Sequence, residues 1–188
     1  MPPATRTARS KRHRTYAASM RRHLCVNLAG PEAGQIERWR HEWDPVMASV
    51  IPAHVTVTYP EETVDEALLL QRAELCHHQT PAFRLRLGEV FTEDEGRGGV
   101  FVAVDDVDRG WADLRRGLLS PPMTPISFPT HVTIAHPRTC RRGPQCYAEL
   151  AGHCARGTVW ARELLFTQTT ANSFTVLRRF PLSAGAND

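Results

Sequence analysis

The pattern of apolar and polar positions predicts alternating strands and helices from residue 23 to residue 182. Apolar spacing and end signals predict helices over 31–49, 64–78, 108–119 and 143–154. Pro45 lies inside the first helix, so we expect a break or kink there. Alternating or β-branched runs predict strands over 23–29, from 54 to about 59, over 83–87 and 100–104, from 130 onward, and in a last hairpin of 158–169 with 174–180.

The order of these elements indicates an internal repeat. From residue 54, the order strand, helix, strand, strand occurs twice with a period of about 77 residues. A period of this length is too long for a solenoid and favours duplication with two-fold pseudo-symmetry. Strands joined by turns form antiparallel sheets, so we expect the α+β class. We predict one bilobal domain over 23–182 and a short C-terminal tail over 183–188.

Two near-identical pentapeptides carry the candidate chemistry. They are HVTVT at 54–58 and HVTIA at 131–135, and each follows a proline by two residues. Alternate residues of a strand point to the same face. One motif therefore places His54 beside Thr56, and the other places His131 beside Thr133. Two such strands facing each other would surround one cavity with two imidazoles and two hydroxyls, a set that suits metal-free chemistry on a phosphodiester.

Composition narrows the class of protein. The chain has 188 residues, of which 41% are hydrophobic and 23% charged, as in one soluble domain. It has no apolar run long enough to span a bilayer and no apolar leader, so we expect no membrane association and a cytoplasmic location. Five cysteines, an odd number, are expected to be reduced thiols.

The net charge of +3 hides a basic N-terminus. Residues 1–22 contain seven arginines or lysines and no acidic residue, whereas the rest of the chain is slightly acidic. We expect a flexible basic arm over 1–22. Three interpretations stay open for it: a leader of little consequence, a tail that binds RNA phosphates without specificity, or a transit segment.

Two His-x-Thr strands in tandem units of this size resemble the 2H phosphoesterase superfamily, in particular its 2′-5′ RNA ligase / 2′,3′-cyclic phosphodiesterase branch. The resemblance extends over about 23–182 and includes LGEVF at 87–91 and VFVAV at 100–104, which look like the middle hairpin of the family. It implies two α+β lobes with antiparallel sheets facing across a central cleft and helices outside. It also implies that neither a metal nor another cofactor is needed. By resemblance, His54 and His131 are the catalytic residues, and Thr56 and Thr133 bind the phosphate.

The expected activity is hydrolysis of 2′,3′-cyclic phosphates or 2′-5′ linkages in RNA 3′ ends or small nucleotides, with 2′-5′ ligation as the reverse reaction. One histidine would be the base and the other the acid; for hydrolysis we assign the acid to His54 and the base to His131. Tyr59 and Phe128 flank the motifs and could stack on a base, and Arg138 is a candidate phosphate contact. We expect a monomer. Two alternatives stay open: an RNA-binding module with a catalytically weak cleft, and a hydrolase of a small cyclic or 2′-5′-linked signalling nucleotide.

Other polar residues carry weaker signals. Many relatives have arginine where this chain has His136, and simple alternation puts His136 on the strand face opposite His131. His77 and His78 are expected at a helix end that favours positive charge. A loose Cys/His group lacks the tight cysteine pair of a zinc site, so we expect idle or buried thiols there; it comprises Cys140, Cys146, His153 and Cys154.

Overall fold

The computed structural model describes residues 20–184. Its strands are β1 (Arg21–Asn27), β2 (His54–Thr58), β3 (Phe83–Glu93), β4 (Gly99–Asp106), β5 (His131–Ala135), β6 (Thr158–Ala161), β7 (Glu163–Thr169) and β8 (Phe174–Pro181). Its α-helices are α1 (Pro31–Trp43), α2 (Pro45–Ala48), α3 (Glu66–Gln79), α4 (Gly110–Leu118) and α5 (Gly143–Leu150). Two single 3₁₀ turns, η1 (Pro60–Glu62) and η2 (Asp94–Gly96), complete the elements.

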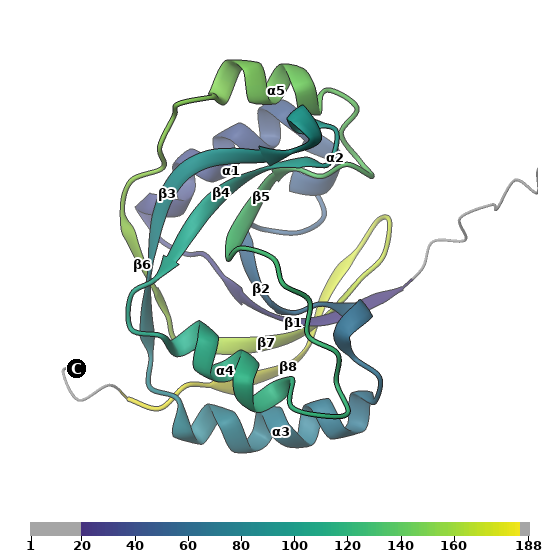
Figure 1. Cartoon of the computed structure of the whole chain (residues 1–188), viewed down its shortest axis with the longest axis vertical. Helices are drawn as coiled ribbons and strands as arrows, with labels where there is room; N and C mark the ends of the chain where they lie inside the picture. The colour runs from purple at the N-terminus through teal and green to yellow at the C-terminus, as the bar shows by residue number, and fades with distance from the viewer. Residues whose placement is uncertain (1–19, 185–188) are drawn as a thin grey trace, which may run out of the picture.

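All eight strands form one antiparallel sheet in the order β6-β3-β4-β5-β2-β1-β7-β8. The sheet curls strongly, with α1, α2 and α5 on the upper half and α3 and α4 on the lower half in Figure 1. The predicted α+β class and the antiparallel pairing are confirmed. The two facing sheets expected from the sequence are the two halves of this one sheet, because β2 and β5 pair at its centre.

The pseudo-symmetry begins one strand earlier than the sequence repeat suggested. The units β1-α1-β2 and β4-α4-β5 occupy mirrored places in the strand order on either side of the centre. Each helix crosses the midline: α1 packs on β5, and α4 packs on β2. The two motif strands are therefore each supported by a helix of the other unit.

The break predicted at Pro45 is confirmed. Helix α1 ends at Trp43 and α2 begins at Pro45, because a proline nitrogen has no hydrogen to donate into the preceding helix. Asp44 has a non-helical backbone between the two helices (φ −137°, ψ 64°), and its side chain accepts a hydrogen bond of 3.1 Å from the amide of Met47. The same carboxylate also contacts the functional site, as described below.

Several boundaries differ from the sequence prediction. Strand β3 extends to Glu93, past the predicted end at 87. Strand β1 begins at Arg21, so the last two residues of the expected arm belong to the sheet. The segment predicted as one strand over 158–169 divides at Arg162, and its halves pair far apart: β6 with β3 and β7 with β1. Helix α5 ends at Leu150, short of the predicted 154. The rest of the expected arm, residues 1–19, and the end of the tail, 185–188, lie outside the described residues.

The alternation of the two motif strands is confirmed. Val55, Val57 and Val132 are fully buried, and Ile134 is 1% exposed. The histidines and the first threonines of the motifs are only half-buried and lie on the other face. The valines and the isoleucine join the main hydrophobic core, so burial of one face fixes which side chains the other face presents. Within residues 20–184, no helix is both long and apolar enough to cross a membrane.

Candidate active site

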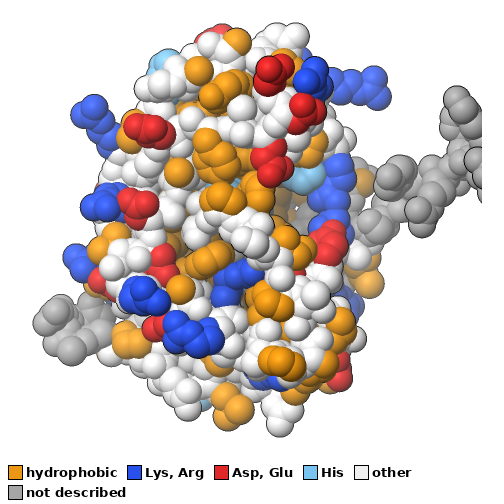
Figure 2. Space-filling view, in the orientation of Figure 1, with side chains coloured by type: hydrophobic (Ala, Val, Ile, Leu, Met, Phe, Trp, Pro, Cys, Tyr) orange, Lys and Arg blue, Asp and Glu red, His pale blue; other side chains and the backbone are white. Residues whose placement is uncertain are grey.

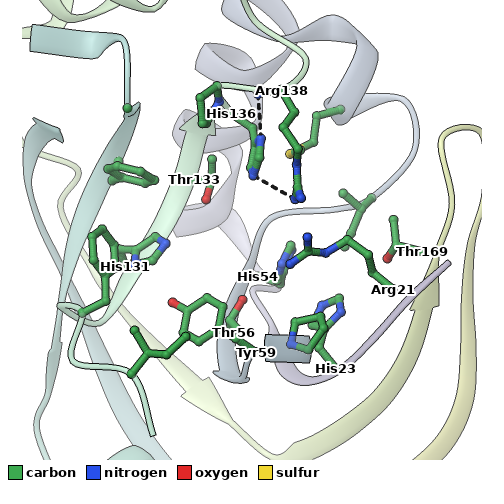
Figure 3. A pocket seen from close by; sticks show the side chains of 18 residues that line it. Arg21, His23, His54, Thr56, Tyr59, His131, Thr133, His136, Arg138 and Thr169 are labelled. Carbon is green, nitrogen blue, oxygen red and sulfur yellow. Dashed lines mark hydrogen bonds between the residues drawn. The ribbon is translucent and has the colours of Figure 1, made fainter. Parts of the chain in front are cut away.

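A cavity of about 300 Å³ opens between the two halves of the curled sheet. All seven side chains predicted from the sequence line it: His54, Thr56, Tyr59, Phe128, His131, Thr133 and Arg138. Figure 3 shows the two motifs from close by, with His54 and His131 reaching the cavity from neighbouring strands. In Figure 2 a histidine, in pale blue, is visible in a hollow of the surface beside arginine side chains.

The two motif strands pair at a single register point, where Val55 lies opposite Val132. Antiparallel pairing around these residues directs each histidine toward the threonine of the other motif. Residues opposite one another on one face of an antiparallel pair have Cβ atoms about 4.5–5.5 Å apart. The cavity therefore combines groups from both motifs at each end.

Each catalytic candidate is oriented by the proline that precedes it. Nδ1 of His54 lies 2.9 Å from the carbonyl oxygen of Pro52, and Nδ1 of His131 lies 2.8 Å from that of Pro129. A carbonyl oxygen can only accept, so Nδ1 carries the hydrogen in both rings. Nε2 is then the nitrogen that each ring offers to a ligand in the cavity.

Burial keeps both imidazoles neutral in the free protein. Desolvation lowers the pKa of His54 to about 3, and His23 is the next largest cause. Desolvation also lowers the pKa of His131, against the hydrogen bond to Pro129. Charge on His131 contributes to the lowering at His54. An anion in the cavity would counteract these effects, because an opposite charge favours the protonated form.

Aromatic rings surround His131. Phe101 and Phe128 pack edge-on against its imidazole, with ring centroids 4.7 and 4.8 Å away. The ring centroid of Phe91 lies 6.4 Å from that of His131. Tyr59 and Ile126 also line the cavity. This end of the cavity is an apolar surface on which a planar base could stack.

A buried ion pair holds the aromatic loops in place. Glu62 is fully buried and binds the half-buried Arg115 at 2.6 Å. The same carboxylate accepts hydrogen bonds of 2.7 Å from the amides of Tyr59 and Ile126. One charged group therefore ties the residue after the first motif to the loop before the second.

The other half of the molecule repeats this arrangement. Arg40 of α1 donates to the carbonyl of Ile51 at 2.5 Å, as Arg115 of α4 donates to that of Ile126 at 3.0 Å. Two acids share the role of Glu62 here: Glu37 pairs with Arg40 at 3.6 Å, and Asp44 binds the chain after the second motif. Its Oδ2 accepts from the amide of His136 at 3.0 Å and from the hydroxyl of Thr139 at 2.6 Å.

Three titratable cavity residues were missed from the sequence: Arg21, His23 and His136. Simple alternation put His136 on the strand face opposite His131, but the structure places it in the lining of the same cavity. Strand β5 ends at Ala135, and the bond to Asp44 turns the chain, so strand alternation no longer applies. Arg21 was assigned to the arm and His23 only to a strand. Neither carried a motif; only the closeness of β1 to β2 in the sheet brings them to the site.

Potential metal ligands gather elsewhere. Among the described residues, the one group with suitable spacing is Glu74, His77 and His78 on α3, whose ligand atoms lie within 4.8 Å of one another. None of the three lines the cavity, and Glu74 is bound to Arg178. The Cys/His group near α5 does not form such a cluster. A reaction without metal stays a prediction.

Comparison with known proteins identifies the family. No curated protein matches the sequence. The fold is similar to that of E. coli LigT in complex with 3′-AMP, with a TM-score of 0.60, 18% identity and coverage of 87% of this chain and 98% of that one. It is also similar to TT0787 of Thermus thermophilus, with a TM-score of 0.61, 15% identity and the same coverage. The sequence model described as the 2′-5′ RNA ligase superfamily matches residues 28–179. The chain thus belongs to the 2′-5′ RNA ligase superfamily of 2H phosphoesterases, whose members are enzymes.

Proposed function

We propose that the protein is a metal-independent phosphodiesterase that opens 2′,3′-cyclic phosphates or cleaves 2′-5′ linkages at RNA ends or in nucleotides. Formation of 2′-5′ linkages is the reverse reaction. The observation that carries this proposal is the matched pair of imidazoles. Each has its Nδ1 fixed on a proline carbonyl and its Nε2 available to the same cavity.

The reaction needs two proton transfers on opposite sides of a phosphorus atom. One imidazole takes a proton from the attacking water as the new P–O bond forms. The other gives a proton to the ribose oxygen as the old P–O bond breaks. General acid–base help of this kind supplies about 10²–10⁴-fold per group. The hydroxyls of Thr56 and Thr133 can donate to the non-bridging oxygens, where negative charge develops.

The surroundings of His54 favour it as the base. Its pKa is lowered to about 3, with burial and His23 as the main causes, so it is the ring more strongly held in the neutral form. We therefore propose His54 as the base and His131 as the acid in hydrolysis. This is the reverse of the assignment made from the sequence.

The test uses His54→Ala and His131→Ala with adenosine 2′,3′-cyclic phosphate and a 2′-5′-linked dinucleotide. We expect each variant to lose about 10²–10⁴-fold in kcat/KM. His41→Ala is the matched control, since His41 is exposed on α1 and does not line the cavity. Turnover like that of the wild type in either cavity variant would contradict the mechanism. Activity lost in EDTA and restored by a metal would contradict metal independence.

A substrate with a good leaving group separates the two roles. Bis(4-nitrophenyl) phosphate releases nitrophenolate, which needs no proton. The variant lacking the acid should keep more activity on it than the variant lacking the base. His131→Ala is expected to be the more active of the two, and the opposite order would restore the sequence-based assignment.

Binding without turnover would point to the RNA-binding alternative. Its signature is salt-sensitive affinity for RNA with no product formed from any cyclic or 2′-5′-linked substrate. The turnover assay is therefore run together with filter binding at several salt concentrations. The two measurements distinguish a phosphodiesterase from an RNA-binding module.

A further inference from the structure

The cavity is chemically different at its two ends. Around His131 it is aromatic, as described above. Beyond His54 two arginines and two imidazoles line it, namely Arg21, Arg138, His23 and His136. Figure 3 shows Arg21 and His23 on the side of His54 away from His131, and His136 and Arg138 above His54. Among the described residues that line the cavity there are two arginines and four histidines but no aspartate or glutamate. A lining of this composition attracts anions.

His136 and Arg138 lie side by side at this end of the cavity and contact each other. The backbone amide nitrogen of Arg138 lies 3.0 Å from Nδ1 of His136. The Nη2 atom of the Arg138 side chain lies 3.2 Å from Nε2 of the same imidazole ring. A neutral imidazole has one nitrogen that accepts and one that donates. Nε2 can therefore accept from the guanidinium of Arg138 only in the tautomer in which Nδ1 carries the hydrogen. A guanidinium has five N–H groups, so this contact with the ring is compatible with donation to an oxyanion in the cavity.

Arg21 completes this end of the cavity from another strand. It lies in β1, where its register partner is Thr169, another lining residue. Its Nη2 is 2.6 Å from Glu61. Glu61 is half-exposed and is not among the lining residues, and it also interacts with the charge of Arg138. Glu61 thus interacts with both arginines from outside the cavity.

We propose that Arg21, His136 and Arg138 form a second anion subsite, which binds a phosphate of the substrate other than the one that reacts. This inference rests on the proposed function and narrows its substrate class. The scissile phosphate lies between the two catalytic histidines, the base stacks near Phe128, and a further phosphate attached through the ribose lies beside Arg138. The substrates are therefore nucleotides with a phosphate on the 5′ oxygen, either as a monoester or as the phosphodiester of an RNA chain.

Kinetics with three substrates test the subsite. They are adenosine 2′,3′-cyclic phosphate with a 5′-hydroxyl, the same nucleotide with a 5′-phosphate, and an adenosine dinucleotide ending in a 2′,3′-cyclic phosphate. We expect kcat/KM at least about tenfold higher for one or both of the phosphate-bearing substrates, the effect of one or two charge-assisted hydrogen bonds. Preference for the 5′-phosphate alone indicates a mononucleotide substrate, and preference for the dinucleotide alone indicates RNA ends.

Variants connect the preference to the proposed residues. Arg138→Gln and His136→Ala should each reduce the ratio of kcat/KM between phosphate-bearing and 5′-hydroxyl substrates by about tenfold. Arg138→Lys, which keeps the charge but loses the planar fork, should give an intermediate ratio. Arg86→Gln is the control, because Arg86 is an exposed arginine paired with Asp105 outside the cavity. Arg138 is exposed, so its substitution should leave the fold intact.

Binding measurements test the subsite separately from catalysis. Calorimetry compares adenosine 3′-phosphate with adenosine 3′,5′-bisphosphate on the wild type and on Arg138→Gln. A gain of about tenfold from the 5′-phosphate, lost in the variant, supports the subsite even if none of the three substrates is turned over. Equal affinity for the two ligands, or a gain that the variant keeps, overturns it. Failure of turnover alone would overturn the proposed function and not the subsite.

Discussion

The imidazole rings of His23 and His54 lie with their centroids 5.6 Å apart, one on β1 and the other on β2. His23 is buried and His54 is half-buried, and desolvation is the main cause that lowers the pKa of His23 to about 4 and that of His54 to about 3. A charge on either ring disfavours a charge on the other. In the free protein both rings are therefore neutral near pH 7, and an anion that enters the cavity favours their protonation.

The first prediction concerns stability at acid pH. The folded-state pKa of His23 is below its unfolded value of about 6.5, so the unfolded chain binds the proton more tightly. The stability that neutral His23 contributes is fully present above pH 6.5 and is lost as the pH falls toward 4. For His23 the loss between pH 7 and pH 5 is about 2 kcal/mol. Urea unfolding at pH 7 and pH 5 should show this loss in the free energy of unfolding, and His23→Phe should make the loss smaller. A loss that is unchanged in His23→Phe, or reduced equally in His41→Phe, would contradict this origin.

The second prediction concerns the pH dependence of the reaction. The pKa values of both His54 and His131 are lowered, and one ring must be protonated to act as the acid. The acid form in the free enzyme becomes scarce above pH 6.5, so kcat/KM should fall as the pH rises from 6.5 to 8.5. The falling limb of kcat should lie at higher pH, because bound phosphate stabilises the protonated imidazole. Initial rates measured from pH 6.5 to 8.5 check this prediction, and a kcat/KM that rises up to pH 8.5 would contradict it.

The third prediction concerns the two hydroxyls. Thr56→Val and Thr133→Val keep the β-branched shape that the strand favours but remove the donor to the phosphate oxygens. Loss of one donor to developing charge should lower kcat by about 10²-fold. Thr175→Val is the control, because Thr175 is exposed on β8. Steady-state kinetics together with unfolding curves measure both effects. A loss of stability that accounts for the lost activity would contradict a role in phosphate binding.

The fourth prediction concerns the ion pair that holds the aromatic loops. Glu62 is fully buried and Arg115 is 11% exposed at its side chain. Glu62→Gln leaves the arginine without its charge partner and should lower the free energy of unfolding by about 3 kcal/mol. KM should rise as well, because the carboxylate also binds the amides of Tyr59 and Ile126. Asp105→Asn breaks an exposed pair with Arg86 and should cost less than about 1 kcal/mol. Equal losses in the two variants would contradict this difference.

The sequence by itself determined the centre of the site. A strand alternates with a period of two, so the buried valines of each motif place the histidine and the threonine together on the opposite face. The proline before each motif was also visible in the sequence. Its carbonyl, however, became the partner of Nδ1 only in the structure. The break at Pro45 and the α+β class followed from equally local rules.

Only the tertiary structure decided what surrounds that centre. His136 lies just after the end of β5, where alternation stops and a buried carboxylate from the other half of the molecule turns the chain. Arg21 and His23 reach the cavity because β1 lies beside β2 in the sheet, a neighbour relation that no local pattern encodes. Likewise, the halves of 158–169 separate to opposite parts of the sheet because their partners are distant strands. Local periodicity fixes which way a side chain points, whereas strand order and long-range hydrogen bonds fix what it meets.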